Sequence, residues 1–259
     1  MSGLRSLAVE IAVDAGAFLL SRFRGPARGV SSKSSVTDLV SDADRDAEAL
    51  IVRRLRDARP DDAVIGEEGT SRAGTSGLSW FVDPLDGTIN FLYGIAHWCV
   101  TLACADADGA IAGVVHDPSR GETFVAERAR GAFLGDRRLA VSHESELARA
   151  LLATGFGYEA DLRRKQGGTI ARVLPLVRDI RRVGSAALDL AWVAAGRYDA
   201  YFETGVNPWD IEAGVLLVRE AGGQVTRLPG VDEDRRPAVL ATNDALHDAL
   251  HTLLVRGGR

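Results

Sequence analysis

The sequence predicts a mixed α and β protein made of two lobes that divide near residue 145. Two observations lead to this prediction. Residues 1–145 open with two amphipathic helical patterns and continue as short strands in a meander, which is typical of an α+β lobe. Residues 146–259 alternate strands with helices, which is typical of an α/β lobe. The chain has 259 residues, so one large domain and two closely packed lobes both fit its length.

Two helices are expected to begin the N-terminal lobe. Apolar residues at helical spacing predict the first helix from Leu4, and Gly25-Pro26 ends it. The second helix is predicted from Ser41 to Arg59, where Pro60 closes it. Strands are then expected at 63–66, 80–83, 98–105, 110–116, 122–127 and 132–134, with a loop rich in Gly and Ser at 69–79.

Strands and helices are expected to alternate in the C-terminal lobe. Strands are predicted at 151–154, 180–183, 199–203, 224–227 and 238–241. Helices are predicted at 161–177, 186–196, 208–221 and 244–255. The run Gly155-Phe-Gly-Tyr-Glu-Ala160 matches the G-x-G-x-x-A pattern of dinucleotide sites. The acid that should end the following strand is missing, because Asp179 precedes that strand, so we do not expect a dinucleotide site.

The composition argues against several classes of protein. The 31 basic and 36 acidic residues give a net charge of -5, which provides no general attraction to nucleic acid or anionic lipid. The two cysteines, Cys99 and Cys104, lie in an apolar stretch, so neither a disulfide framework nor a cysteine-based zinc site is expected. The sequence contains no 18-residue apolar run and no signal peptide, and we expect a soluble cytoplasmic protein.

The densest cluster of polar residues is the segment Trp80-Phe-Val-Asp83-Pro-Leu-Asp86-Gly-Thr88-Ile-Asn90. Asp83 and Asp86 are three residues apart beside a proline and a turn glycine, so they can converge on one hard cation, with backbone carbonyls as further ligands. Gly87 permits the close approach of a bound group, and Thr88 could open a helix aimed at phosphate. The alternative is an Asp-Pro turn with an aspartate N-cap, and these residues alone favour neither interpretation.

Two further acidic positions have both a functional and a structural interpretation. Glu67 and Glu68 follow a predicted strand, and adjacent acids repel one another unless a cation or solvent separates them. Adjacent acids in loops are more often solvated than bound to metal. Neighbouring strand ends could nevertheless bring the carboxylates of Glu67 and Glu68 close to those of Asp83 and Asp86. Asp44 either completes a capping box with Ser41 or accepts a hydrogen bond that polarises a nucleophilic hydroxyl or water, and the sequence alone favours the cap.

Three separated motifs follow one another along the chain. They are Gly66-Glu-Glu68, then Trp80-x-x-Asp-Pro-Leu-Asp-Gly-Thr-x-Asn-Phe91, then Asn207-Pro-Trp-Asp-x-x-Ala-Gly214 with Glu220-Ala-Gly-Gly223 after it. In this order and spacing they resemble the inositol monophosphatase family of magnesium-dependent, lithium-sensitive phosphomonoesterases. The similarity covers nearly the whole chain, including Lys33-Ser34-Ser35 and the segment from Asp38 to Asp44.

The resemblance implies a layered αβαβα phosphatase fold of the kind shared with fructose-1,6-bisphosphatase. It implies one continuous domain, 1–259, in which the lobe 1–145 carries most of the metal ligands. The lobe 146–259 would carry Asp210 and the substrate pocket. That Asp210 reaches the same site as Asp86, 124 positions earlier (210 minus 86), rests on the resemblance alone.

The resemblance also implies a role for each residue of the site, with two or three Mg²⁺ ions as cofactor. The first ion would be bound by Glu67, Asp83 and the main-chain carbonyl of Leu85. The second ion would be bound by Asp83, Asp86 and Asp210, and a weaker third through water on Glu67. Thr88, hydrogen-bonded to Asp44, would orient the attacking water, and the amides of Gly87 and Thr88 would hold phosphate. The polyol pocket would be lined by Asp86, Gly184, Ser185, Ala186 and Glu203, with Lys33 near the phosphate.

The oxygen-only ligand set supports this assignment on chemical grounds. Carboxylates and carbonyls favour magnesium over zinc, and paired cations can neutralise phosphate, align a nucleophile and stabilise a leaving alkoxide. The absence of a candidate catalytic histidine is therefore no objection. One departure from the family is Gly69, which stands where a small hydroxyl residue or alanine is common.

The function implied is hydrolysis of a small phosphorylated polyol, foremost myo-inositol 1-phosphate, because Ile89 and the run Phe91-Leu-Tyr-Gly94 resemble the inositol branch of the family. Histidinol phosphate, fructose 1,6-bisphosphate and 3'-phosphoadenosine nucleotides are alternative substrates on the same scaffold. A regulatory partner of RNA polymerase or of ribosome assembly is the alternative from another class. Since family members are often homodimers, a homodimer is expected, with no membrane contact and no direct binding of nucleic acid.

Overall fold

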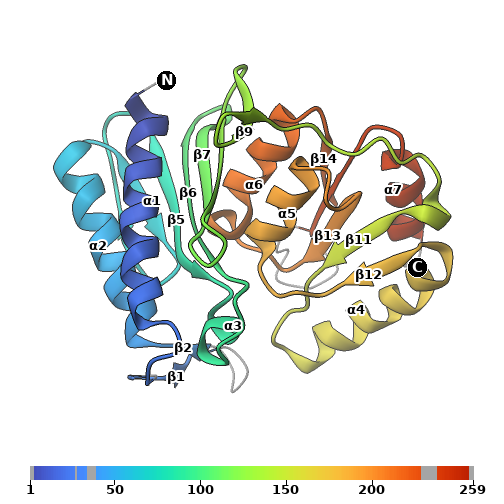
Figure 1. Ribbon diagram of the computed structural model, residues 1–259, viewed down its shortest axis with the longest axis horizontal. Helices are drawn as coiled ribbons and strands as arrows, with labels where there is room; N and C mark the ends of the chain where they lie inside the picture. Colours follow the sequence, from blue (N-terminus) through green and yellow to red (C-terminus); the bar gives the residue numbers. More distant parts are fainter. Residues whose placement is uncertain (1–2, 27, 34–38, 229–237, 257–259) are drawn as a thin grey trace.

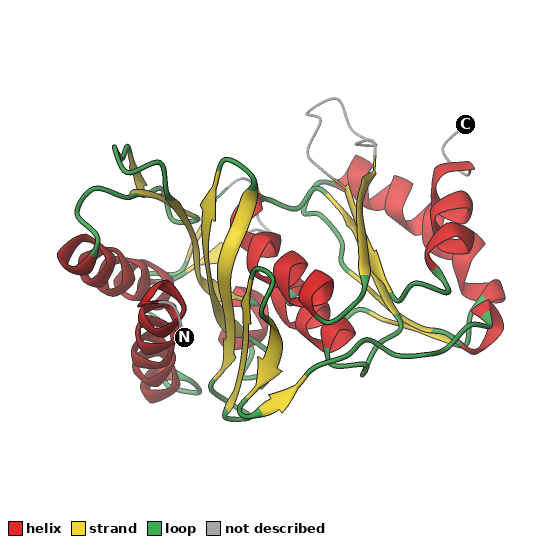
Figure 2. Ribbon diagram, turned by 90° about the horizontal axis from the view of Figure 1, so that it is seen from above, coloured by secondary structure: helices red, strands yellow, loops and turns green. Residues whose placement is uncertain are grey.

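The computed structural model describes residues 3–26, 28–33, 39–228 and 238–256, which stack helices and sheets in five layers (Figures 1 and 2). Helices α1 (Gly3–Arg22) and α2 (Asp42–Ala58) form the first layer, and an eight-stranded sheet forms the second. Helices α5 (Ala186–Ala194) and α6 (Pro208–Glu220) separate this sheet from a five-stranded one. Helices α4 (Ala160–Val173) and α7 (His247–Arg256) cover the outer face. This is the αβαβα arrangement that the sequence predicts.

The eight-stranded sheet belongs to the N-terminal lobe. Its strands, in spatial order, are β10 (Arg137–Arg138), β9 (Gly131–Leu134), β8 (Glu122–Glu127), β7 (Gly109–Asp117), β6 (Cys99–Asp106), β5 (Ser79–Asp86), β3 (Ala63–Gly66) and β4 (Ser71–Arg72). All neighbours are antiparallel except β3 and β5. Because β3 and β5 are parallel, both strands end at the same edge, where Glu67 follows β3 and the short helix α3 (Thr88–Leu92) follows β5.

The five-stranded sheet belongs to the C-terminal lobe. Its strands, in spatial order, are β12 (Asp179–Arg181), β11 (Leu151–Thr154), β13 (Ala200–Thr204), β15 (Ala238–Thr242) and β14 (Gln224–Leu228). Strand β11 is parallel to both of its neighbours, whereas β15 is antiparallel to both of its own. The carboxyl ends of β11 and β13 therefore point toward the eight-stranded sheet's loops, with Glu203 on β13.

Helices α5 and α6 are apolar on most sides because they lie between two sheets. The largest core cluster contains residues from both lobes, among them Phe124, Leu188, Tyr201 and Val239. Glycine permits the close packing here: a Cβ on Gly214 of α6 would lie 2.5 Å from the Cβ of Leu190 on α5. A helix with a larger residue at this position would have to move away from its neighbour.

Most predicted elements are present, and the differences are local. Strand β5 does not end at residue 83 but continues to Asp86, with an irregular register between Asp83 and Asp86. Helix α4 ends at Val173 instead of 177, because Pro175 lies in a separate 3₁₀ turn, Leu174–Leu176. Helix α7 begins at His247 instead of 244. The two-residue strands β4, β10 and the β1–β2 pair (Ser31–Ser32 with Leu39–Val40) were not predicted, since a pattern of two residues has no periodicity.

Two exclusions from the sequence can be compared with the structure. Among the described residues, no helix is long and apolar enough to cross a membrane. Cys99 and Cys104 are both buried free thiols.

Candidate active site

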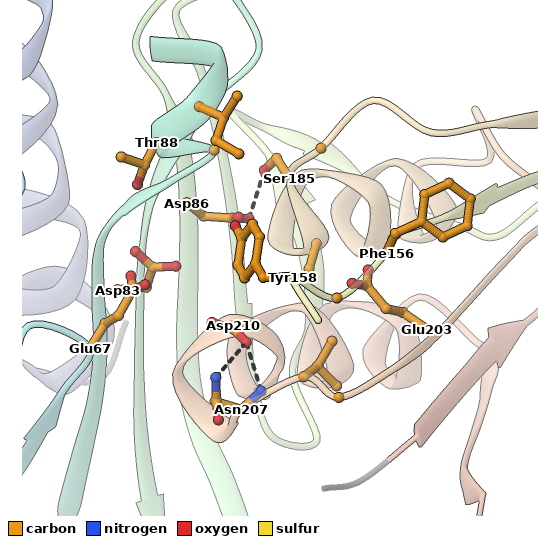
Figure 3. A pocket seen from close by; sticks show the side chains of 18 of the residues that line it. Glu67, Asp83, Asp86, Thr88, Phe156, Tyr158, Ser185, Glu203, Asn207 and Asp210 are labelled. Atoms are coloured by element: carbon orange, nitrogen blue, oxygen red, sulfur yellow. Dashed lines mark hydrogen bonds between the residues drawn. The ribbon is translucent and has the colours of Figure 1, made fainter. Parts of the chain in front are cut away.

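One pocket brings together most of the side chains singled out from the sequence (Figure 3), and Asp44 lies outside its lining, bonded to Thr88. Its volume is about 270 Å³, and it lies where the end of β5 and α3 face the first turns of α5 and α6. The N-terminal lobe contributes Lys33, Glu67, Asp83, Leu85, Asp86, Gly87 and Thr88 to its lining, and the C-terminal lobe contributes Gly184, Ser185, Ala186, Glu203 and Asp210. The two lobes therefore share one site.

Asp44 forms the capping box that its sequence position predicts, and its second oxygen accepts a hydrogen bond from Thr88. It is fully buried, and its Oδ2 accepts hydrogen bonds from the Ser41 backbone N–H (3.0 Å) and the Ser41 hydroxyl (2.6 Å), which complete the capping box of α2. Its other oxygen, Oδ1, accepts from the Thr88 hydroxyl at 2.8 Å. The cap thus holds Asp44 rigidly while one oxygen is directed at Thr88.

The turn after β5 presents Asp83 and Asp86 to the pocket. The backbone N–H of Leu85 donates to Asp83 Oδ1 at 2.9 Å, so the Asp-Pro-Leu segment folds back on its own carboxylate. Gly87 follows with φ of 99°, and a Cβ there would lie 3.0 Å from the carbonyl oxygen of His97. This position therefore requires glycine, which turns the chain into α3 and directs Thr88 toward Asp44.

Asp86 is bound to the first turn of α5. Its Oδ2 accepts from the Ser185 hydroxyl and from the Ala187 backbone N–H, both at 2.7 Å. Ser185 is itself the N-cap of α5 and is almost completely buried. Burial raises the pKa of Asp86 to about 6, although the donors from Ser185 and Ala187 lower it. A second link between the lobes is Asn90, whose side-chain amide donates to the carbonyl of Val183 at 2.9 Å.

Asp210 reaches the same pocket from the start of α6. Its Oδ2 accepts from the backbone N–H of Asn207 at 2.6 Å, in a second capping box. Burial, and then the charge of Glu67, raise the pKa of Asp210 well above its usual range, and the charge of Asp86 adds to this. No spacing in the sequence predicts that Asp210 lies near Asp86, and the fold brings the two residues to one pocket.

The electrostatics of the pocket suit a bound cation. Burial raises the pKa of Asp83 well above its usual range, and the charges of Glu67, Asp86 and Asp210 raise it further. The four carboxyl groups offer hard oxygen ligands, and they repel one another until a cation or protons neutralise them. Such a set of ligands fits Mg²⁺. Within the described ranges, no three His, Cys, Asp or Glu side chains are close enough to hold an ion as they stand, so metal binding stays a prediction that requires side-chain movement.

Lys33 lies against the two glutamates at the end of β3. Its ammonium donates to Glu67 Oε1 at 2.9 Å and to Glu68 Oε1 at 2.5 Å. Burial opposes the charge of this ammonium, but Glu67 and Glu68 outweigh burial and raise the pKa of Lys33. Burial also raises the pKa of Glu68 to about 7. The remainder of the two N-terminal motifs, residues 34–38, lies outside the described residues.

Glu48 holds the loop that carries these glutamates, and the sequence analysis missed it. Its buried carboxylate accepts from the backbone N–H groups of Glu68 (2.8 Å) and Thr70 (3.1 Å) and from the Thr70 hydroxyl (2.6 Å). A Cβ on Gly66 would overlap this carboxylate. The signal was available: Glu48 is four residues after Asp44, on the face of α2 that carries Ala47 and Ile51.

Glu203 stands across the pocket from Glu67 and Asp83 (Figure 3). Its Oε2 accepts from the Tyr201 hydroxyl at 2.7 Å, and burial raises its pKa to about 7. The loop from Gly155 to Glu159, which matched a dinucleotide pattern, lines the pocket beside it. A Cβ on Gly155 would overlap the Glu203 carboxylate, so this glycine makes room for an acid of the site.

Asp189 is a further acid of the pocket that the sequence analysis missed. It lies on α5, lines the pocket and is 1 % exposed, and its Oδ1 has no hydrogen-bond partner in the part of the chain that the structure describes. Burial, and then the charges of Glu203 and Asp86, raise its pKa well above the usual range, while Arg182 lowers it. A charged residue inside the apolar run Ala186-Ala-Leu-Asp-Leu-Ala-Trp-Val-Ala194 was the signal available in the sequence.

Comparison with known proteins identifies relatives over nearly the whole chain. The model of the inositol monophosphatase family matches residues 1–257. An inositol-1-monophosphatase of Mycobacterium bovis is 43% identical over 241 residues, which cover 86% of this chain and 83% of that protein. A protein of Xylella fastidiosa described as Nus factor SuhB is 42% identical over 234 residues, covering 87% and 85%.

Solved structures agree with these matches. The extragenic suppressor protein suhB of Bartonella henselae has a TM-score of 0.92 at 39% identity, covering 99% of this chain and 100% of that chain. An IMPase of Thermotoga maritima has a TM-score of 0.88 at 32% identity, covering 99% and 98%. Both fold and sequence thus point to one family.

Proposed function

The chain belongs to the inositol monophosphatase family, and from this membership we propose that it is a Mg²⁺-dependent phosphatase that releases phosphate from myo-inositol 1-phosphate. The observation that carries the proposal is the convergence of Glu67, Asp83, Asp86 and Asp210 on one pocket beside Thr88. Asp210 comes from the other lobe, so the acidic cluster exists only in the folded chain. A purely structural set of acids would be expected to pair with arginines, whereas burial raises the pKa of Asp83 and Asp210 and the charge of Glu67 raises both further.

The proposed ligands follow from the chemistry of the donors. Glu67, Asp83, Asp86, Asp210 and the carbonyl of Leu85 would hold two or three Mg²⁺ ions, after Lys33 releases Glu67. When bound, these ions would neutralise the phosphate oxygens, help a water to ionise and stabilise the leaving alkoxide. The amides of Gly87 and Thr88 would add hydrogen bonds to phosphate.

The chain's own residues would orient the attacking water. The Thr88 hydroxyl has one proton, and at 2.8 Å Asp44 Oδ1 accepts it. The lone pairs of Thr88 Oγ1 are then free to accept a hydrogen bond from a water molecule. Because Ser41 fixes Asp44 through two hydrogen bonds, Thr88 is held in one orientation. The proposed role of this relay is to position the water, and the proton need not leave Thr88.

The leaving alcohol would lie on the C-terminal side of the pocket. Among the described residues, Tyr201 alone donates a hydrogen bond to Glu203, so this carboxylate can accept others from a polyol. Gly184 and Ala186 would border this region, and Ser185 would act through Asp86, to which its hydroxyl is bonded.

Phosphate release from four substrates tests the proposal. They are myo-inositol 1-phosphate, histidinol phosphate, fructose 1,6-bisphosphate and a 3'-phosphoadenosine nucleotide, each assayed with Mg²⁺ and with EDTA. We expect Mg²⁺-dependent release that is fastest from the inositol ester. Faster release from another of the four esters would identify that ester as the preferred substrate. No release from any of them would refute the enzymatic proposal.

A second candidate function rests on relatives described as Nus factor SuhB, which are 40 to 42% identical to this chain. It is regulatory binding to RNA polymerase or to ribosome-assembly factors. Recovery of such proteins by both the wild type and Asp83→Asn would support a binding role independent of hydrolysis. Recovery by neither would leave hydrolysis as the single proposed function.

A further inference from the structure

Two buried aspartates with opposite environments lie in this molecule. Asp62 and Asp189 are each 1 % exposed. Asp62 accepts hydrogen bonds from the guanidinium of Arg59 (2.8 and 3.1 Å), the hydroxyl of Ser76 (2.7 Å) and the indole N–H of Trp80 (2.9 Å). Asp189 Oδ1 accepts none. Only one of the two carboxyl groups is therefore satisfied by its own protein.

The difference has an energetic meaning. A buried carboxyl group without donors destabilises a fold, because it has lost its hydration without compensation. A neutral residue in place of such a carboxyl group would not lower the stability of the fold in this way. The presence of the acid therefore indicates a role other than folding. Asp62 is far from the pocket lining, whereas Asp189 is part of it.

The groups that face Asp189 show which ligand would suit it. Glu203 and Asp86 act on it as negative charges, and Arg182 acts as the one positive charge. The phenol groups of Tyr198 and Tyr201 are also near enough for Asp189 to raise their pKa. Since Arg182 already provides a cation here, a neutral donor suits the site better than a second cation. A hydroxyl is a neutral donor with one proton to give.

From this placement we infer that Asp189 is a specificity-determining residue that, with Glu203, accepts hydrogen bonds from hydroxyl groups of the leaving alcohol. The inference rests on the proposed phosphatase function. Glu203 stands across the pocket from Glu67 and Asp83 (Figure 3), and Asp189 lines the same pocket within reach of the Glu203 charge. With the phosphate held at the N-terminal side, as proposed, these two acids would face the leaving alcohol. An alcohol without hydroxyl groups would leave Asp189 unpaired, and the enzyme would discriminate against it.

The test compares two substrates and two variants. The substrates are myo-inositol 1-phosphate and phenyl phosphate. The leaving alcohol of the first carries hydroxyls besides the one that formed the ester, and the leaving alcohol of the second carries no others. For Asp189→Asn, the ratio of kcat/KM for the inositol ester to that for phenyl phosphate is expected to fall by about 10- to 100-fold. Asp62→Asn is the matched control, since it removes an equally buried charge away from the pocket, and its ratio is expected to stay at the wild-type value.

Thermal stability provides a second readout that a structural role would not reproduce. Asp189→Asn is expected to keep or raise the Tm, because it removes an unpaired buried acid, whereas Asp62→Asn is expected to lower it. A ratio that is unchanged in Asp189→Asn would overturn the inference. A parallel loss on both substrates together with a lower Tm would also overturn it, since Asp189 would then be structural.

Failure of the proposed function can be told apart from failure of the inference. If the wild type hydrolyses neither ester, the proposed function is wrong. Calorimetric titration with free myo-inositol then decides the inference. Weaker binding to Asp189→Asn than to the wild type and Asp62→Asn would support it, and equal or absent binding would overturn it.

Discussion

The N-terminal and C-terminal sides of the pocket treat their acids differently. On the N-terminal side, both oxygens of Asp44 and both oxygens of Glu48 accept hydrogen bonds from the protein. On the C-terminal side, Glu203 accepts one, and Asp189 Oδ1 accepts none. A carboxylate whose two oxygens both accept hydrogen bonds from the protein fixes the geometry of a loop or a hydroxyl. A carboxylate with a free oxygen can still accept a hydrogen bond from a ligand. Under the proposed function, this difference assigns positioning of the reacting groups to the first side and recognition of the leaving alcohol to the second.

The acids proposed to bind metal lie between these extremes. Asp83, Asp86 and Asp210 each accept some donors from the backbone or a hydroxyl, yet their pKa values remain raised. Such groups are stabilised by a cation more than by further hydrogen bonds.

The largest effect is expected from removing a carboxylate of the metal cluster. Asp83→Asn should lower kcat/KM for phosphate esters by about 1,000-fold or more, because several kcal/mol of charge stabilisation would be lost. The fold should remain intact, since the variant removes a buried, repelled acid. Phosphate release and circular dichroism measure the two outcomes. The exposed ion-pair residue Asp179, changed to Asn, is the control, and substantial activity in Asp83→Asn would refute the metal assignment.

The next effect concerns the hydrogen-bond relay on the N-terminal side. Thr88→Val removes the hydroxyl that Asp44 orients and should lower kcat by about 100- to 1,000-fold. Thr88→Ser keeps the hydroxyl and should recover most of the activity. Steady-state kinetics on both variants make the comparison. If valine and serine reduce kcat equally, the shape of Thr88 matters and its hydroxyl does not.

A smaller loss is expected from loosening the glutamate loop. Glu48→Gln replaces an acceptor with an amide that cannot accept from both Glu68 and Thr70, so Mg²⁺ affinity or activity should fall about 10- to 100-fold. The loss of stability should be about 1–3 kcal/mol. Glu220→Gln is the matched control, because Glu220 accepts from the backbone of Ala129 and Gly131 away from the pocket. Urea unfolding should show both variants destabilised, with Mg²⁺ binding impaired in Glu48→Gln alone.

The smallest effect is a dependence of stability on pH. The pKa values of Asp86 (about 6) and Glu203 (about 7) are raised above the unfolded values, so the folded chain binds more protons than the unfolded chain between about pH 4 and 7. Without divalent ions, these groups therefore make the free energy of unfolding fall as the pH rises through this range.

Calorimetry at pH 5 and pH 7.5, with EDTA and with Mg²⁺, checks this dependence. Mg²⁺ should raise the Tm more at pH 7.5, where the carboxylates are ionised, than at pH 5. Asp86→Asn should reduce the fall between the two pH values. An equal effect of Mg²⁺ at both would contradict the assignment of the raised pKa values to the metal site.

The sequence predicted the parts of this molecule that depend on local patterns. The helices, the meander and the Asp-Pro-x-Asp-Gly-Thr turn follow from periodicity and turn chemistry. The capping box of Asp44 was visible as Ser41-x-x-Asp44, and the family motifs named most of the pocket.

The residues that the sequence analysis missed depend on tertiary packing. Nothing local indicates that Glu48 reaches the loop of Glu68, 20 residues later, or that α5 places Asp189 at the pocket. The convergence of Asp210 with Asp83 likewise requires both sheets to pack on α6. Each of these acids lies on an apolar helix face, and this placement is the one local sign that the residue has a particular role. The role itself depends on contacts with residues that are distant in the sequence.

Phosphate release from myo-inositol 1-phosphate by wild type and Asp210→Asn, measured over a range of Mg²⁺ concentrations, tests the central claim most directly. Asp210 is the proposed ligand from the C-terminal lobe, so a shared metal site predicts release that requires Mg²⁺ and falls by more than about 100-fold in the variant. Release that persists in EDTA, or an Asp210→Asn variant with wild-type activity and Mg²⁺ dependence, would contradict it.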